Sequence, residues 1–209
     1  MSTLVCTLLL GVFVLSGCSE AEGQPDVPKD FARCHQFLGE KNVGTVVDEM
    51  GEGDPKVAAR LGLRELAGRL RSEAEAWTER DLLHDSYSAC RISVLGKDDG
   101  AQVTEATVKW SVLTVKSMSE PKYTRSWRKV NGQVFVEKET GRPSMKLLVA
   151  CGVSGAPSGQ ELGLPLEMEV ADPGLNLSLR QNVLTAFARA ITGELACADT
   201  PEIPTALPG

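Results

Sequence analysis

Thiol chemistry is available at six positions of this 209-residue sequence, which are Cys6, Cys18, Cys34, Cys90, Cys151 and Cys197. A cysteine thiolate can attack a substrate, bind a metal ion or form a disulfide. Structural zinc sites usually take their ligands from pairs that lie a few residues apart. No two of the last four cysteines are that close in the chain. We therefore expect no metal site.

Other candidate nucleophiles lack the neighbours that catalysis requires. Ser154 lies in the segment G-V-S-G-A, which lacks the final glycine of the G-x-S-x-G motif. Ser126 and Lys129 match S-x-x-K, but the companion motifs of that enzyme class are absent. His35 and His84 are the only histidines, and His35 adjoins a cysteine that we expect in a disulfide. We predict no enzyme activity and no cofactor, with a cell-envelope hydrolase built from dispersed residues as the alternative.

Two pairs of carboxylates, Glu137 with Glu139 and Glu167 with Glu169, have the spacing of residues on one face of a strand. A glycosidase pair would lie in a cleft with aromatic platforms, and aromatic residues make up only 5% of the chain. We expect both pairs on the solvent side of their strands.

The start of the chain has the pattern of an export signal. An apolar run occupies residues 4–15, which is too short for a transmembrane helix of about 20 residues. Leu15-Ser16-Gly17-Cys18 follows and resembles the bacterial lipobox, in which the cysteine thiol accepts a diacylglycerol. The resemblance implies a signal peptide over residues 1–17 and a lipid on Cys18 that anchors the protein at the outer face of the cell membrane. Residues 1–3 lack the usual Lys or Arg, so we expect the true start to lie upstream.

An exported protein experiences an oxidising environment, in which an even number of cysteines indicates disulfides. Four cysteines remain after removal of the signal peptide and lipidation of Cys18, and four allow three pairings. We prefer Cys34–Cys90 and Cys151–Cys197, because each pair joins a helical segment to a nearby strand through the shorter loop.

Charge excludes one class of partner. The chain has 22 basic and 28 acidic residues, for a formal net charge of −6. Nucleic-acid-binding proteins usually present a basic surface, so we expect no nucleic-acid partner. A possible basic surface for anionic lipids or an acidic protein lies on a helix that we predict over residues 54 to about 81. Its residues are Arg60, Arg64 and Arg71, which lie near one stripe of that helix. A merely solvated face is the alternative.

Two long helices are predicted from apolar residues at intervals of three and four. The first runs from residue 54 to about 81, with Asp54 as N-cap and Pro55 at its first position. The second runs to about residue 195, with Ser178 and Gln181 in a capping box. Shorter helices are predicted near residues 31–38 and 43–50.

About six strands are predicted between these helices, at residues 89–95, 107–115, 123–130, 133–138, 145–153 and 166–170. Asn131-Gly132 is a strong hairpin signal. Because the strands occur in one block, we expect an α+β fold with a mainly antiparallel sheet packed between N-terminal helices and a C-terminal helix. This single domain should cover residues 30–198, between a flexible tether at 18–29 and a disordered tail at 199–209.

The layout resembles the small secreted lipoproteins of actinobacteria. The features in common are the lipobox at Cys18, the segment P-K-D-F-A-R-C that ends at Cys34, and the late helix that ends in L-A-C at Cys197. Some of these lipoproteins look like PsbP-type domains, an antiparallel sheet with helices. The resemblance implies no catalytic residues. We therefore expect a membrane-tethered binding or accessory domain, with an unknown protein or envelope ligand as partner.

Overall fold

Seven strands form one sheet in the computed structural model, which describes residues 28–95, 101–138, 143–172 and 174–208. The strands are β1 (Pro55–Ala58), β2 (Ser86–Leu95), β3 (Ala101–Trp110), β4 (Trp127–Lys129), β5 (Val134–Glu137), β6 (Ser144–Val149) and β7 (Leu166–Ala171). The helices are α1 (Lys29–Leu38), α2 (Glu40–Glu49), α3 (Leu63–Ala76), α4 (Pro121–Thr124), α5 (Gln160–Gly163) and α6 (Leu177–Leu195), with a short 3-10 turn, η1, at Ser117–Ser119. The sheet order is β1-β2-β3-β7-β6-β5-β4 and every neighbouring pair is antiparallel. The α+β prediction is thus confirmed, with seven strands rather than about six.

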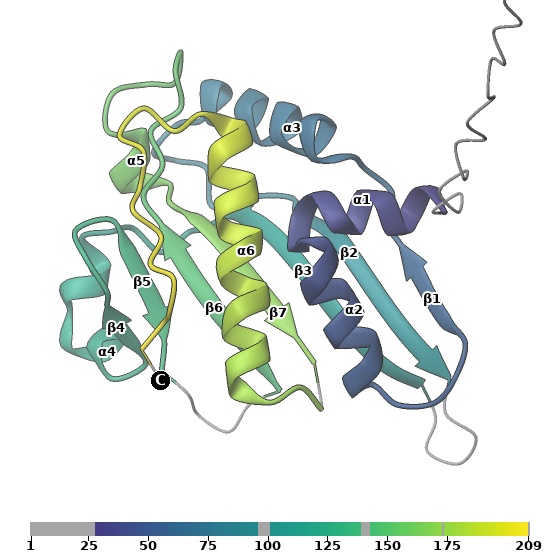
Figure 1. Cartoon of the computed structure of the whole chain (residues 1–209). Helices are drawn as coiled ribbons and strands as arrows, with labels where there is room; N and C mark the ends of the chain where they lie inside the picture. Colours follow the sequence, from purple (N-terminus) through teal and green to yellow (C-terminus); the bar gives the residue numbers. More distant parts are fainter. Residues whose placement is uncertain (1–27, 96–100, 139–142, 173, 209) are drawn as a thin grey trace, which may run out of the picture.

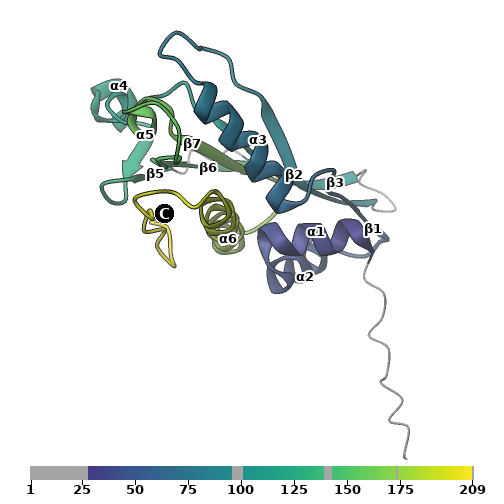
Figure 2. The same ribbon diagram turned by 90° about the horizontal axis from the view of Figure 1, so that it is seen from above.

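Helices from the N-terminal and C-terminal parts of the domain lie side by side on one face of the sheet. Figure 2 shows α1, α2 and α6 on the same side, and α3 crossing the end of the sheet. The rings of Phe37 in α1 and Phe187 in α6 meet edge to face with centroids 6.2 Å apart. Strand residues that point to this side, such as Ile92, Val108 and Val170, are buried. One apolar sheet face needs one helical layer, and that layer combines N- and C-terminal segments.

The opposite face is charged across its centre. Lys146 lies 3.2 Å from Glu167 and 3.3 Å from Glu169, and Lys109 lies 3.5 Å from Glu167. Burial lowers the pKa of Lys146, but the two carboxylates outweigh it and hold that pKa above its usual value. The prediction that Glu167 faces solvent is wrong, because these cations cover it and it is buried.

A second, smaller apolar cluster covers one end of this charged face. Met118, Trp127, Phe135 and Leu148 form it, and the segment with η1 and α4 folds over it (Figure 2). The strand predicted at 123–130 therefore contains only β4, because Pro121 begins a short helix before it. The Asn131 turn is as expected: its Oδ1 accepts hydrogen bonds from the backbone of residues 133 and 134, between β4 and β5.

The helix predicted from residue 54 begins nine residues later. Pro55 starts β1 at the sheet edge, where its missing N–H costs no ladder hydrogen bond. Residues 55–58 pair with 94–91 of β2, and Gly62 is the N-cap of α3. The D-P pair is compatible with a helix start or an edge strand, and pairing with a distant segment decided between them.

Both disulfides join the predicted partners. Cys34 of α1 bonds to Cys90 of β2 with a Cα–Cα distance of 5.2 Å, and Cys151 bonds to Cys197 at 5.0 Å. A β-bulge between Ser88 and Cys90 buries two consecutive residues of β2. The bulge shifts the alternation of the strand, and beyond it the cysteine faces the helical layer.

The start of α6 lies close to a buried ion pair. Asn176, not Ser178, is the N-cap, and its side chain accepts a hydrogen bond from the backbone N–H of Leu179. Arg180 Nε donates to Asp172 Oδ2 at 2.6 Å, and both side chains are buried. This bridge ties the end of β7 to the first turn of α6.

Residues 199–208 pack against the domain, whereas the sequence predicts a disordered tail at 199–209. Ile203 and Leu207 are buried in the main core, and the chain runs back along α6 (Figure 1). Arg189 donates to the carbonyl oxygen of Ile203 at 2.8 Å, and Asn131 donates to that of Glu202 at 2.8 Å. At the other end, Lys29 belongs to α1 rather than to the predicted tether. Residues 1–27, which include the predicted signal peptide and most of the predicted tether, lie outside the described residues.

Both edges of the sheet are short. One edge is β1, with four residues, a proline and the exposed Lys56. The other edge is β4, with three residues, of which Arg128 and Lys129 are exposed.

Candidate binding groove

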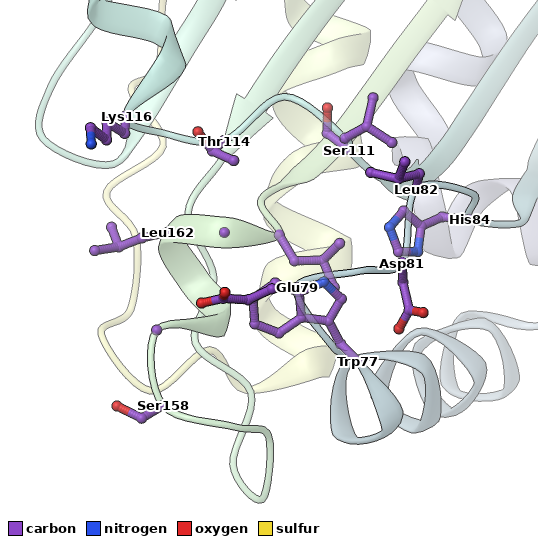
Figure 3. Close-up of a pocket in the computed structure, with 14 residues that line it drawn as sticks. Trp77, Glu79, Asp81, Leu82, His84, Ser111, Thr114, Lys116, Ser158 and Leu162 are labelled. Carbon is purple, nitrogen blue, oxygen red and sulfur yellow. The ribbon is translucent and has the colours of Figure 1, made fainter.

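Three segments that are far apart in the chain enclose a hollow of about 430 Å³ beyond the C-terminal end of α3 (Figure 3). They are residues 77–84 after α3, residues 111–116 after β3, and residues 158–164, which include α5. We call this hollow the Trp77 groove. Its volume falls within the range of small-molecule sites in proteins.

The rim of the Trp77 groove is apolar and open to solvent. Leu82 is 73% exposed, Val112 57% and Leu162 53%, and the adjoining Leu83 is 93% exposed. Among the described residues, the only other exposed large hydrophobic side chain is Leu95, which does not line the groove. A concentration of exposed apolar side chains at one hollow is typical of a binding site.

The far wall of the groove is held in place by one buried side chain. Gln160 of α5 accepts a hydrogen bond from the backbone N–H of Val153 at 3.0 Å, and it donates to the carbonyl oxygens of Cys151 and Leu164. All its hydrogen bonds are to the chain around α5, so Gln160 fixes the short helix against the end of the sheet.

Trp77 approaches this wall closely. A Cβ atom added to Gly163 would lie 2.6 Å from Cη2 of the Trp77 ring, so the ring occupies space that only a glycine leaves. The turn that follows is closed by Asp81, whose Oδ2 accepts a hydrogen bond from the N–H of Thr78 at 2.8 Å. Together these contacts position the 77–84 segment, with Leu82 and His84 across the opening from Leu162 (Figure 3).

The serine of the groove is not arranged as a nucleophile. Ser111 is buried, and its hydroxyl donates to Glu167 Oε2 at 3.0 Å while it accepts from the N–H of Leu113. A serine nucleophile needs a base such as histidine as its hydrogen-bond partner. His84 lines the same groove, but the hydroxyl hydrogen bond goes to the carboxylate of Glu167.

A smaller hollow of about 250 Å³ adjoins the Trp77 groove and shares the side chains of Trp77, Asp81 and His84 with it. Glu73 lines this second hollow, and burial raises the pKa of its carboxyl group. The hydroxyl of Tyr87 donates a hydrogen bond to Glu73 Oε1. Burial and this carboxylate together raise the pKa of Tyr87.

The three arginines predicted as a possible basic surface are dispersed. Arg60 precedes α3 and lines a separate hollow with Arg69 and Arg91. Arg64 is exposed, 3.7 Å from Glu194. Arg71 donates to the carbonyl oxygen of residue 195 at 3.1 Å, at the end of α6. Because α3 begins later than expected, Arg60 is not on it. Arg71 is on α3, but its side chain is bound to the end of α6.

The remaining candidates do not converge. Ser126 and Ser154 are exposed on separate loops, and His35 lies on α1. Cys18 lies outside the described residues. No cluster of three or more potential metal-binding side chains occurs in the described ranges. In the same ranges, no helix is both long and apolar enough to span a bilayer.

The Trp77 groove was missed at the level of sequence. The one local signal is Leu82-Leu83, two adjacent leucines in a charged stretch between a helix and a strand. Comparison of the chain with protein families, curated proteins and solved structures finds no match.

Proposed function

We propose that this chain is a non-enzymatic binding domain, held at the outer face of the cell membrane by a lipid on Cys18, and that the Trp77 groove binds an apolar ligand. The observation that carries the proposal is the apolar rim. Burying the exposed leucines and Val112 under a ligand would release free energy in proportion to the apolar area covered, about 25 cal/mol per Å².

The chemistry of the groove supports binding over catalysis. Ser111 donates its hydroxyl hydrogen to Glu167, and Asp81 closes a turn. The two disulfides agree with an oxidising, extracytoplasmic compartment. The resemblance of residues 15–18 to a lipobox supports the proposed lipid anchor on Cys18.

The test uses the processed chain, residues 18–209 with Cys18→Ser, labelled with nitrogen-15. The chain has three tryptophans, and each gives one indole N–H signal in a two-dimensional spectrum. Titration with 1-hexanol should shift the signal of Trp77. The signal of Trp110, whose indole N–H donates to the carbonyl oxygen of Leu70 inside the core, should not move.

Matched substitutions test whether hexanol binds in the Trp77 groove. Leu82→Ser and Leu162→Ser should each weaken the hexanol shift, whereas Leu95→Ser, which alters an exposed leucine away from the groove, should leave it unchanged. Equal effects of all three, or no shift of Trp77, would contradict the proposal. Turnover of an ester or amide probe that is abolished by Ser111→Ala or His84→Ala would establish the hydrolase alternative instead.

A further inference from the structure

Two of the three Asp, Glu, Lys or Arg side chains that line the Trp77 groove among the described residues are acidic. Glu79 and Asp81 line it, and Lys116 is the one lysine or arginine among its described lining residues. In Figure 3, Lys116 lies on the side of the opening away from Asp81 and His84. The segment between α3 and β2 carries three acidic residues, Glu79, Asp81 and Asp85, and one arginine, Arg80, so its net charge next to the exposed leucines is negative.

The adjoining hollow extends this acidic side. It is lined by Glu73 and Asp85 in addition to the shared Asp81. Neither Glu79 nor Asp85 has an ion-pair partner within the described part of the chain. These carboxylates are thus available to a cation from outside the chain.

Hydrogen-bonding capacity is also unused behind this surface. Oε2 of Glu73 and Nε2 of His84 are buried and have no hydrogen-bond partner among the described protein atoms. Buried polar atoms are usually paired. A carboxylate oxygen accepts a hydrogen bond, so Oε2 of Glu73 suits an N–H donor.

We propose that the Trp77 groove and the adjoining hollow together select small amphiphilic cations, ligands that join a short apolar chain to an ammonium group. The apolar chain lies against Leu82, Val112 and Leu162, and the ammonium group lies beside Glu79, Asp81 and Asp85. This inference depends on the proposed function, since it names the class of ligand for the same groove.

Three six-carbon probes of different charge separate the two proposals: n-hexylammonium, 1-hexanol and hexanoate. Their dissociation constants are measured from the Trp77 indole signal of the processed chain at pH 7 and low salt. Exposed ion pairs contribute about 0.2–1 kcal/mol each, or about 1.4- to 5-fold in affinity. With several carboxylates at one site, we expect hexylammonium to bind at least about fivefold more tightly than hexanol, and hexanoate to bind more weakly than either.

The variant Glu79→Gln/Asp85→Asn should remove most of the preference for hexylammonium and leave the affinity for hexanol unchanged. Both positions are exposed, so the fold should be retained. Glu52→Gln/Asp54→Asn removes the same charge from exposed residues outside both hollows and should change neither affinity. Asp81 is left intact, because it closes the turn.

Each outcome decides one proposal. If hexanol or hexanoate binds as tightly as hexylammonium, or if the control variant loses the same affinity as the test variant, the selection for cations is wrong while the apolar groove stands. If no probe moves the Trp77 signal, the proposed function and this inference both fail.

Discussion

Gly163 sets the position of the Trp77 ring, and its replacement provides a sharp test of the groove. Ala at this position is compatible with the helical backbone, but its Cβ would overlap the ring. Gly163→Ala should therefore displace Trp77, cost about 1–3 kcal/mol of stability and weaken hexanol binding. The measurement is the indole spectrum: the Trp77 signal moves and that of Trp110 stays. An unchanged Trp77 signal would mean that the ring does not pack as described. Gly132→Ala, at a glycine with open space around it, is the control.

Glu73 should make stability depend on pH. Its carboxyl pKa is raised above 4.5 in the folded chain, mainly by burial, so the folded state binds the proton more tightly than the unfolded state. This contribution is fully present below about pH 4.5 and is lost as the pH rises through the raised pKa. Glu73→Gln should match the original protein at pH 4 and exceed its stability at pH 8, by less than about 1 kcal/mol because the site is partly solvated.

Urea unfolding at the two pH values measures this difference. The amide oxygen of the variant can still accept the hydrogen bond from Tyr87, so the comparison isolates the charge. Glu75→Gln, two residues along the same helix and exposed, serves as the control. A gain of equal size at pH 4 and pH 8 would show that the raised pKa of Glu73 is not the cause.

At the scale of elements, the two disulfides fix helices to strands. Cys34–Cys90 closes a separation of 56 residues between α1 and β2, and Cys151–Cys197 closes one of 46. A disulfide that closes a loop of this size lowers the conformational entropy of the unfolded chain and thereby stabilises the folded state by about 4 kcal/mol. Cys34→Ala/Cys90→Ala should lower the free energy of unfolding by about that amount, measured in urea. Since domain stability is about 5–15 kcal/mol, removal of both disulfides should prevent folding at 37 °C. An unchanged urea midpoint in the first variant would overturn this account.

The elements that the sequence predicts correctly are those whose pattern involves residues close together in the chain. The apolar spacing within 63–76, the Asn131-Gly132 turn and the alternation of β7 all depend on residues a few positions apart. β1 has only four residues, and its pairing with β2, more than thirty positions later, decided its structure. Leu207 is buried in the main core, which no pattern in the tail reveals. The Trp77 groove is harder still to predict from the sequence, since its three segments meet only after the sheet has formed. These segments are residues 77–84, 111–116 and 158–164.

For the whole molecule, export and lipid anchoring at Cys18 are the properties that the sequence predicts most directly, and they have a direct test. Cys18→Ala removes the thiol that would accept the lipid, so labelled palmitate should no longer be incorporated and the chain should remain an uncleaved precursor or appear in the medium. Cell fractionation with mass spectrometry of the N-terminus measures both results. Membrane association and cleavage that are unaffected by the substitution would rule out the lipobox interpretation.

The short sheet edges have a consequence for the membrane anchoring that we propose. Molecules confined to a membrane surface diffuse in two dimensions and meet each other far more often than in free solution. Exposed edge strands are templates on which identical chains polymerise. Here one edge carries Lys56 and a proline, and the other carries Arg128 and Lys129, so two like edges that approach each other bring equal charges together. With the proposed anchor, such a domain can cover a cell surface densely without growing into fibrils.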